Sequence, residues 1–263
     1  MRITAPDILK MKTTGAKIAM VTAYDAAMAR IVDQAEVEMV LVGDSLGMVI
    51  QGQPDTLGVT LRDMAYHGRC VAAGLKRAHL TVDMPFMSYQ VSAAQALRSA
   101  GKLVQQGKAQ SVKLEGGERS APAIRAIVEA GIPVVGHIGL TPQSVHAFGG
   151  FKLQGKDNAE RVVADAHAVA AAGAFCLVLE KIPADLAARI TAELAIPTVG
   201  IGAGVACDGQ VLVINDLLGM DARFKARFVR RYLEGDPVVT DAVRAYVADV
   251  KAGTFPAPEH TYA

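Results

Sequence analysis

The chain has 263 residues, with 27 basic and 26 acidic side chains and a formal net charge of +1. This balance gives no electrostatic basis for binding nucleic acid. An aromatic content of 5% without tryptophan argues against a surface on which bases stack. The three cysteines are too far apart for a disulfide framework or a paired-cysteine metal site. These exclusions leave small-molecule chemistry or a binding scaffold.

A hydrophobic content of 51% is enough for a sizeable core. No apolar run has the length needed to cross a membrane, and the N-terminus shows no hydrophobic segment followed by a small-residue cleavage site. We therefore expect a cytoplasmic protein with no membrane contact. No linker or low-complexity segment divides the sequence, so one domain over residues 1–263 is predicted.

Eight short apolar runs recur along the chain, each followed by a polar residue or glycine. They span residues 17–25, 39–45, 79–85, 111–117, 133–139, 176–182, 197–204 and 211–219. Continuous apolar runs, in contrast to alternating ones, are typical of parallel strands that are buried on both faces.

Segments with helical periodicity separate these runs. Residues 26–38 predict a helix with Ala27, Ile31, Val32 and Ala35 on one stripe, and residues 123–131 predict a helix that stops at Gly131. Eight strand–helix units predict an α/β fold, a single (β/α)₈ TIM barrel with a C-terminal helical tail. The alternative is an open doubly wound sheet, but residues 200–204 lack the full spacing of a dinucleotide fingerprint.

Chemically active side chains end several of the predicted strands. Asp44, Asp83 and Glu115 end the second, third and fourth strands, His137 ends the fifth, and Glu180 ends the sixth. In such barrels the catalytic groups stand at the carboxyl ends of the strands. We therefore expect these side chains to converge on one mouth of the barrel.

Three converging carboxylates repel one another unless their charge is neutralised. Mg²⁺ takes oxygen ligands and keeps positions open for substrate and water, whereas the lack of His or Cys at these three strand ends disfavours zinc and copper. The other interpretation is that each acid caps a helix or pairs with a nearby cation. The sequence favours a metal site formed by Asp44, Asp83 and Glu115.

Further polar residues accompany these acids. Lys113 lies on the same strand face as Glu115 and is predicted either to pair with an acid or to bind a substrate carboxylate. Ser45 could offer its hydroxyl and its backbone N–H to an anion. Glu180 follows four apolar residues and is predicted either to act as a general base or to pair with Lys181 or cap a helix.

Two features between the fifth and sixth strands have open interpretations. His137 could act as an acid or base, although a hydrogen bond to a carbonyl is the commoner role. Residues 148–156, with Lys152 and Lys156, form either a solvated loop or a lid for a second anionic substrate. The whole pattern predicts a Mg²⁺-dependent barrel enzyme acting on a small oxo acid, whose enolate the metal stabilises after a base removes a proton.

The sequence closely resembles the ketopantoate hydroxymethyltransferase (3-methyl-2-oxobutanoate hydroxymethyltransferase) family over about residues 3–261. The motifs that carry this resemblance are "TAYDAAMA", "VLVGDSLGMVIQG", "LRDMAYH", "DMPFMSY", "VKLEGGE", "GHIGLTPQSVHAFGGFKLQG", "LVLEKIP" and "IPTVGIGAG". The closing "YVADVKAGTFPAPEHTY" is similar to the C-terminal tail of that family.

The resemblance implies transfer of a hydroxymethyl group from 5,10-methylenetetrahydrofolate to 3-methyl-2-oxobutanoate, giving 2-dehydropantoate for pantothenate and coenzyme A biosynthesis. It implies one Mg²⁺ per subunit and a homo-oligomer, a decamer by analogy with similar enzymes. Matching the motifs assigns the metal ligands to Asp44, Asp83 and Glu115, the oxo-acid contacts to Asp44, Ser45, Asp83 and Lys113, and the proton acceptor to Glu180.

Two other functions remain open on the sequence alone. One is a Mg²⁺-dependent oxo-acid carbon–carbon lyase of the same barrel group, an activity that usually uses a reactive cysteine on a mobile loop or a set of phosphate-holding residues. None of the three cysteines lies in a loop that fits this role. The other is an oxo-acid binder without turnover, which would have no need for a base such as Glu180.

Overall fold

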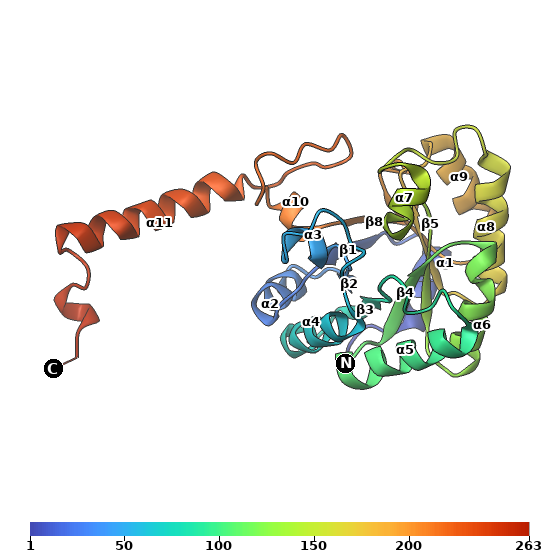
Figure 1. Cartoon of the computed structure of the whole chain (residues 1–263), viewed down its shortest axis with the longest axis horizontal. Helices are drawn as coiled ribbons and strands as arrows, with labels where there is room; N and C mark the ends of the chain where they lie inside the picture. Colours follow the sequence, from blue (N-terminus) through green and yellow to red (C-terminus); the bar gives the residue numbers. More distant parts are fainter. Residues whose placement is uncertain (263) are drawn as a thin grey trace. The chain divides into compact units, whose positions relative to one another are not determined.

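The computed structural model describes residues 1–262 and divides into two compact units, Met1–Val213 and a second unit that begins at Ile214. The first unit contains eight parallel strands that close into a barrel, with helices around them (Figure 1). The predicted (β/α)₈ TIM barrel is thus confirmed. A single domain spanning residues 1–263 stays a prediction.

The elements follow one another as strands separated mostly by helices. The strands are β1 (Ile18–Thr22), β2 (Met39–Val42), β3 (His79–Asp83), β4 (Ser111–Glu115), β5 (Val134–Gly139), β6 (Cys176–Glu180), β7 (Thr198–Ile201) and β8 (Gly209–Leu212). The helices of the first unit are α1 (Ala5–Thr14), α2 (Ala26–Gln34), α3 (Leu46–Val49), α4 (Leu61–Gly74), α5 (Ala93–Gly107), α6 (Ala121–Glu129), α7 (Val145–Phe148), α8 (Ala159–Ala171) and α9 (Ala184–Glu193).

Each strand pairs in parallel with the next, and β1 closes the barrel against β8, where Met20 lies opposite Val211. Because all strands run in one direction, their carboxyl ends form a single mouth. This geometry brings residues from distant parts of the sequence to one place.

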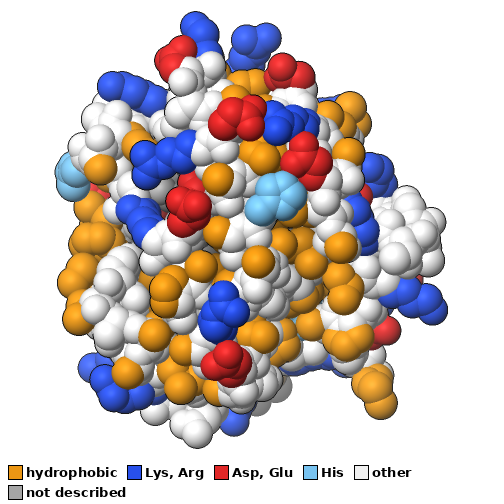
Figure 2. Space-filling model, turned by 90° about the vertical axis from the view of Figure 1, so that its right-hand side faces the viewer, with side chains coloured by type: hydrophobic (Ala, Val, Ile, Leu, Met, Phe, Trp, Pro, Cys, Tyr) orange, Lys and Arg blue, Asp and Glu red, His pale blue; other side chains and the backbone are white. Residues whose placement is uncertain are grey.

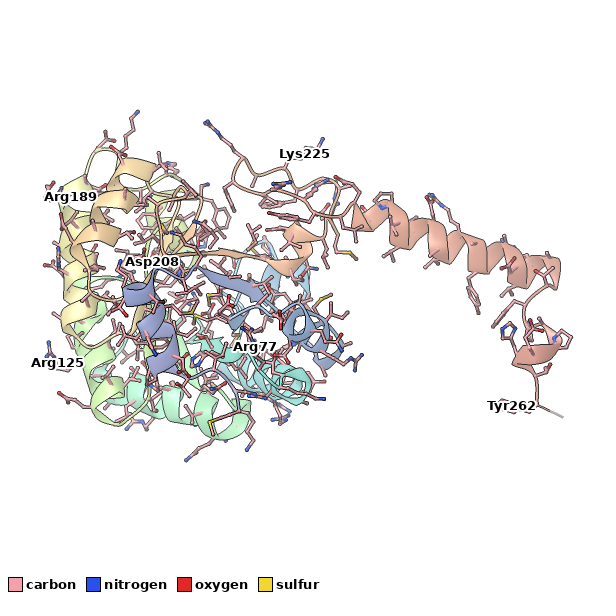
Figure 3. All side chains as sticks on the ribbon, turned by 180° about the vertical axis from the view of Figure 1, so that it is seen from behind. Arg77, Arg125, Arg189, Asp208, Lys225 and Tyr262 are labelled. Carbon is pink, nitrogen blue, oxygen red and sulfur yellow. The ribbon has the colours of Figure 1, made fainter. Side chains whose placement is uncertain are left out.

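Helix α1 packs at the opposite, amino-terminal end of the barrel. Its side chains Ala5 and Ile8 join a core cluster that includes Met20 and Met39 from the strands. Full burial of a side chain such as Ile8 contributes about 1.5–3 kcal/mol to stability. The Lys12 ammonium forms an ion pair of 2.8 Å with Asp208, which lies beside α1 in Figure 3.

The structure departs from the predicted elements in three places. The run 211–219 is a strand only at its start, because residues Ile214–Leu217 form helix α10. Within the described chain, β7 and β8 are joined by residues 202–208 without a helix. Helix α2 buries Ala29 and Val32, so the predicted stripe is right for Val32 and wrong for Ala27, Ala35 and Ile31, the last of which is 55% exposed.

The second unit contains α10, an irregular segment and the 18-residue helix α11 (Gly235–Ala252). Helix α11 buries only Gly235 among its described residues. It exposes an apolar stripe formed by Val238, Val239, Val243, Tyr246, Val247 and Val250. Among residues 1–262, every helix is too short or too polar to span a membrane.

A buried polar chain lies near the amino-terminal end of β3. His79 donates from Nδ1 to the Ile3 carbonyl at 3.1 Å, and its Nε2 accepts from the Ser111 hydroxyl at 2.9 Å. Ser111 in turn contacts the Thr81 hydroxyl at 2.9 Å. The neutral imidazole therefore satisfies both of its nitrogens, and burial lowers the pKa of His79 to about 4.

This burial predicts a pH dependence of stability. The pKa of His79 falls from 6.5 in the unfolded chain to about 4 in the fold, so protons bind the unfolded state more readily. Its contribution is complete above pH 6.5 and is lost as the pH falls toward 4, by up to about 3 kcal/mol. In urea unfolding between pH 7.5 and 4.5, His79→Gln should lose less stability than the unmutated chain.

His167→Gln is the matched control, because the His167 side chain is 51% exposed and pairs with Glu193 on the surface. It should leave the pH dependence nearly unchanged. An equal pH dependence in His79→Gln and the unmutated chain would contradict the assignment to His79.

Candidate active site

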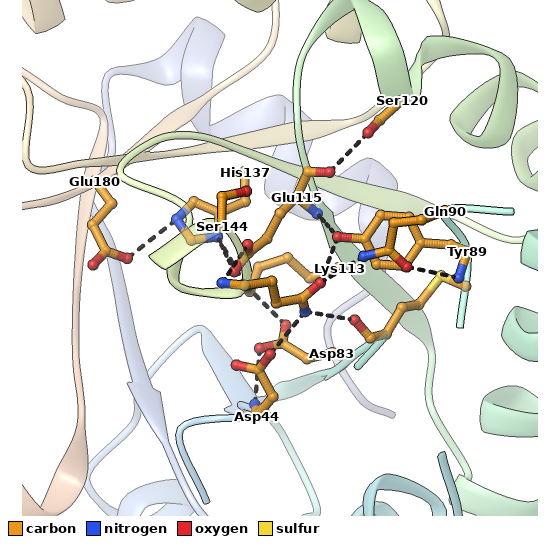
Figure 4. A network of polar contacts seen from close by, with 12 residues as sticks. Asp44, Asp83, Tyr89, Gln90, Lys113, Glu115, Ser120, His137, Ser144 and Glu180 are labelled. Atoms are coloured by element: carbon orange, nitrogen blue, oxygen red, sulfur yellow. Dashed lines mark hydrogen bonds and ion pairs between the residues drawn. The ribbon is translucent and has the colours of Figure 1, made fainter. Parts of the chain in front are cut away.

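The predicted acids meet at the mouth of the barrel (Figure 4). Asp83, Glu115 and Glu180 are the last residues of β3, β4 and β6, and Asp44 lies two residues beyond β2. Asp44, Asp83 and Glu115 are between 2% and 4% exposed, so water screens their charges only weakly. Lys113, two residues before the end of β4, lies in the same cluster.

A tight turn after β2 brings Asp44 against the end of β3. The backbone N–H of Asp44 donates to Asp83 Oδ2 at 3.1 Å. A Cβ atom at Gly43 would lie 2.6 Å from Ser45 Oγ and 3.6 Å from Asp83 Oδ2, so a side chain there would force the Ser45 hydroxyl to move. The Ser45 hydroxyl also contacts the Tyr24 hydroxyl at 2.9 Å.

The ammonium group of Lys113 lies among the acids. Its Nζ is 3.0 Å from Asp83 Oδ1 and 3.2 Å from His137 Nδ1. Burial lowers the pKa of Lys113, but the charges of Asp83, Glu115 and Asp44 outweigh this and raise it above its ordinary value. The predicted internal ion pair is confirmed, and the substrate contact stays a prediction.

His137 connects the acid cluster to Glu180, a role that the sequence did not indicate. Its Nε2 lies 3.2 Å from Glu180 Oε2 and its Nδ1 lies 3.5 Å from Glu115 Oε1. Burial and the Lys113 charge lower the pKa of His137, whereas Glu115 and Glu180 raise it, and the resulting value is about 9. The side chain contacts charged groups instead of the carbonyl that its commoner role would require.

The two contacts of Nδ1 correspond to different protonation states of His137. A lysine ammonium only donates, so the 3.2 Å contact with Lys113 requires a lone pair on Nδ1 and places the ring proton on Nε2. Proton transfer to Nδ1 would instead favour Glu115 at 3.5 Å. The pKa of about 9 keeps the ring protonated near neutral pH, with Nδ1–H toward Glu115 and Nε2–H toward Glu180, so the neutral ring that accepts from Lys113 forms only at higher pH. His137 Nε2 and Glu180 Oε2 lie at ion-pair distance but are not aligned as a hydrogen bond.

Gln143 joins three parts of the site. Its side-chain Nε2 donates to Asp44 Oδ2 at 2.8 Å and to the Met84 carbonyl at 3.0 Å, and its backbone N–H donates to Glu115 Oε2 at 3.0 Å. Its Oε1 accepts from the Tyr89 hydroxyl at 2.7 Å. One residue from the segment after β5 thus orients acids that end two different strands.

Tyr89 completes this arrangement from the segment after β3. Its hydroxyl accepts a hydrogen bond from the backbone N–H of Glu115 at 3.1 Å while it donates to Gln143. Burial and the Glu115 charge raise the pKa of Tyr89 well above its usual value, so the hydroxyl keeps its proton. Both hydrogen-bonding functions of the phenol are used.

The cluster contains more acidic than basic groups. Three buried carboxylates, Asp44, Asp83 and Glu115, surround the single ammonium of Lys113. Burial and repulsion from Asp83 and Glu115 raise the pKa of Asp44 well above its usual range. Burial also raises the pKa of Asp83, although Lys113 opposes this. Bound protons or a divalent cation would relieve the excess negative charge.

The geometry of the acids fits a Mg²⁺ ion bound by two carboxylates better than one bound by three. Within residues 1–262, no three His, Cys, Asp or Glu side chains are placed to hold one metal ion together. Mg²⁺ is often bound by one or two carboxylates, with water and substrate completing its octahedron. Asp44 and Asp83 adjoin, with the Asp44 N–H on Asp83 Oδ2 and the Lys113 ammonium 3.0 Å from Asp83 Oδ1. Glu115 Oε2 is already held by Gln143.

The surroundings of Glu180 differ from the predicted pairing with Lys181. The Lys181 ammonium donates to the Phe151 carbonyl at 2.6 Å, and the Lys181 carbonyl accepts from the Gln154 N–H at 3.0 Å. These bonds tether the loop after α7 to the end of β6. The Glu180 side chain, 15% exposed, is left beside His137 and open to the mouth.

The cysteines offer no nucleophile at the mouth. Cys176 is the first residue of β6, at the opposite end of that strand from Glu180, and burial raises the pKa of its thiol to about 12. Cys207 is also buried, and Cys70 lies on helix α4. The site therefore differs from one that uses a reactive loop cysteine.

Solved structures share this fold over nearly the whole chain. Phosphonopyruvate hydrolase has a TM-score of 0.66 at 12% identity, covering 100% of this chain and 92% of its own. Its complex with oxalate and Mg²⁺ has a TM-score of 0.65 at 11% identity, with the same coverage. A 2,3-dimethylmalate lyase gives 0.61 at 16% identity, covering 100% and 93%. The fold and the buried polar mouth define a TIM-barrel protein with the site arrangement of barrel enzymes.

Sequence comparison identifies the family within this class. The family model "Ketopantoate hydroxymethyltransferase" matches residues 2–258. A 3-methyl-2-oxobutanoate hydroxymethyltransferase of Pelobacter propionicus is 56% identical, covering 99% of this chain and 97% of the relative. One from Trichlorobacter lovleyi is 54% identical, covering 99% and 98%. The chain belongs to the ketopantoate hydroxymethyltransferase family, and it is a transferase enzyme.

Gln143 hydrogen-bonds both Asp44 and Glu115, so its replacement should disturb the acid cluster. Gln143→Leu removes the donor to Asp44 and the acceptor of the Tyr89 hydroxyl, and a buried polar group left unpaired costs about 1–3 kcal/mol. We expect a lower free energy of unfolding in urea. We also expect at least a several-fold weaker affinity for Mg²⁺ by isothermal titration, because Asp44 loses its orientation.

Gln110→Leu is the matched control at the other end of the barrel. Gln110 donates to the Ile3 carbonyl at 2.9 Å and accepts from the Leu80 N–H at 3.1 Å. This variant should lose stability yet keep its Mg²⁺ affinity. If both variants bind Mg²⁺ equally well, Gln143 does not orient the metal site.

Proposed function

We propose that this enzyme transfers a hydroxymethyl group from 5,10-methylenetetrahydrofolate to 3-methyl-2-oxobutanoate and forms 2-dehydropantoate, a step toward pantothenate and coenzyme A. The observation that carries the proposal is the convergence of Asp44, Asp83, Lys113 and Glu115 beside Glu180 at one mouth. The chain that carries this site also matches, over almost its full length, relatives that are named for this reaction.

The metal site of the proposal uses Asp44 and Asp83 as direct ligands, with Glu115 acting through water. The oxygen donors and the unmatched negative charge at the mouth support Mg²⁺. A magnesium complex of phosphonopyruvate hydrolase, which has the same fold, is compatible with this choice. When bound, the ion supplies positive charge beside the carboxylate and keto oxygens of the oxo acid.

Lys113 and Ser45 bind the oxo acid in this proposal. The Lys113 ammonium is buried, charged and fixed by Asp83, so it provides a preorganised positive charge for an oxyanion. The Ser45 hydroxyl, held by Tyr24, follows Asp44 in the turn at the mouth and can donate to a substrate oxygen. Both groups stabilise the negative charge that develops on the keto oxygen.

Glu180 is the proposed general base. It accepts the C3 proton of the oxo acid, and His137 holds its carboxylate from one side at 3.2 Å. The electron pair released at C3 then forms the carbon–carbon bond to the methylene carbon that the folate supplies. Water provides the hydroxyl oxygen, both carbon–nitrogen bonds from the methylene carbon to the folate break, and tetrahydrofolate leaves with protons on the freed nitrogens. The loop tethered by Lys181 borders this carboxylate and is the proposed lid.

Proton exchange tests the base without the folate. In deuterated water with Mg²⁺, the protein should exchange the C3 proton of 3-methyl-2-oxobutanoate, followed by NMR. Glu180→Gln should slow exchange by at least about a hundredfold, the usual effect of losing a positioned base. Its affinity for the oxo acid should change little, because the binding groups remain.

Glu193→Gln, at an exposed position on α9, is the control and should exchange at the unmutated rate. Unchanged exchange in Glu180→Gln would exclude Glu180 as the base. Absence of exchange and of folate-dependent turnover in the unmutated protein would overturn the transferase proposal.

We also propose that the chain forms a homo-oligomer, a decamer by family analogy. The apolar stripe of α11 supports this proposal, since six of its large side chains are at least 40% exposed. Val243→Glu should lower the molar mass measured by sedimentation equilibrium, whereas Ala248→Glu on the opposite side of the helix should not. A monomeric mass for the unmutated protein would contradict the oligomer.

A further inference from the structure

We infer that a groove between α4 and α5 on the outside of the barrel binds a nucleoside phosphate, an anion joined to a planar ring. The groove has a volume of about 380 Å³, within the range of small-molecule sites. Three cations, Arg62, Arg69 and Lys102, line it together with Tyr66 and Gln106. These residues are exposed, in contrast to the buried acids of the mouth.

The charge of these two helices is unlike that of the whole chain. They carry four cations, Arg62, Arg69, Arg98 and Lys102, and a single acid, Asp63, whereas the chain has 27 basic and 26 acidic residues. Asp63 accepts from the Thr60 N–H at 2.9 Å and from the Thr60 hydroxyl at 2.6 Å, so it caps the helix. The local field is therefore positive and attracts an anion.

The lining cations also lack acidic partners. Among residues 1–262, none of the ion pairs includes Arg62, Arg69 or Lys102. On α9, by contrast, Arg189 pairs with both Glu160 and Glu193. Figure 2 shows acidic and basic side chains intermixed on one face of the molecule. Guanidinium groups that are free of carboxylates match a phosphate in both charge and geometry.

Tyr66 provides the contact for a planar ring. Its ring is held edge-on by His67, with centroids 5.3 Å apart, and the Arg69 guanidinium lies 5.7 Å from its centroid. Tyr66 is nevertheless 55% exposed. A base can stack on this ring while Arg69 and Lys102 bind the phosphates. The cations lie on two helices that approach closely, because a Cβ at Gly68 would be 2.7 Å from the Gly107 carbonyl oxygen.

The groove is separate from the acid cluster in the fold. Helices α4 and α5 flank β3 in the sequence, and the groove lies on their exposed sides. The mouth of the barrel is lined by buried acids that repel anions, whereas the groove attracts them. A nucleoside phosphate bound here should therefore not compete with the oxo acid.

Equilibrium titration of the full chain with ADP, pyrophosphate and adenosine tests the inference, in buffer without Mg²⁺ so that the nucleotide stays uncomplexed. We expect saturable binding of ADP, at least fivefold weaker binding of pyrophosphate and no saturable binding of adenosine. With Mg²⁺ restored, so that the mouth can bind the oxo acid, an excess of 3-methyl-2-oxobutanoate should not displace ADP. Displacement by the oxo acid would place the nucleotide in the mouth and overturn the inference.

Substitutions separate the two parts of the site. Arg69→Ala and Lys102→Ala should each weaken ADP binding by about tenfold, the effect of losing one charge-assisted phosphate contact. Tyr66→Ala should reduce the affinity for ADP to that for pyrophosphate. Arg125→Ala, which removes an outward-pointing cation on α6 (Figure 3), should leave ADP binding unchanged.

Three kinds of binding result would contradict the inference. Absence of saturable ADP binding, or unchanged ADP affinity in both Arg69→Ala and Lys102→Ala, would overturn the site. Pyrophosphate binding as tight as ADP, or no effect of Tyr66→Ala, would overturn the planar-ring part. Equal weakening by Arg125→Ala would indicate nonspecific attraction to positive charge.

Discussion

The mouth of this barrel concentrates negative charge in a place that water hardly reaches. Closing eight parallel strands brings their carboxyl ends together, so acids from β2, β3 and β4 must share one buried volume. One ammonium, that of Lys113, is not enough to balance three carboxylates. The surrounding residues hold the three buried carboxylates in one geometry despite their mutual repulsion.

Three kinds of contact hold the acids in place. Backbone N–H groups donate to them, from Asp44 to Asp83 and from Gln143 to Glu115. The Gln143 amide and the Tyr89 hydroxyl connect segments that follow different strands. Because each donor is itself fixed by the fold, the carboxylates are oriented before any ligand binds, which is the condition for tight metal and transition-state binding.

The sequence predicted the part of this site that depends on strand periodicity. Asp83, Glu115 and Glu180 follow apolar runs directly, and alternation on β4 placed Lys113 beside Glu115. It did not predict Gln143 or Tyr89, because these residues lie in irregular segments whose path depends on tertiary contacts. The strand-end position of His137 was visible, but its charged neighbours come from β4 and β6 and depend on barrel closure.

Fold prediction succeeded and failed for related reasons. Buried parallel strands leave long apolar runs, and all eight were recognisable. The predicted run that begins at residue 211 extends past the end of β8 because helix α10 is also apolar on one side. Hydrophobic periodicity cannot distinguish so short a helix from a strand. The basic character of α4 and α5 was hidden by the near-zero net charge, since an average over the chain removes local asymmetry.

Strand β3 shows how one short element can serve stability and chemistry separately. At its amino end, burial keeps His79 neutral, with both ring nitrogens hydrogen-bonded and no charge to balance. At its carboxyl end, Asp83 Oδ2 accepts from the Asp44 N–H, and Asp83 Oδ1 lies 3.0 Å from the Lys113 ammonium. The amino end satisfies its polar groups without any charge, whereas the carboxyl end belongs to a cluster whose excess negative charge a divalent cation can balance.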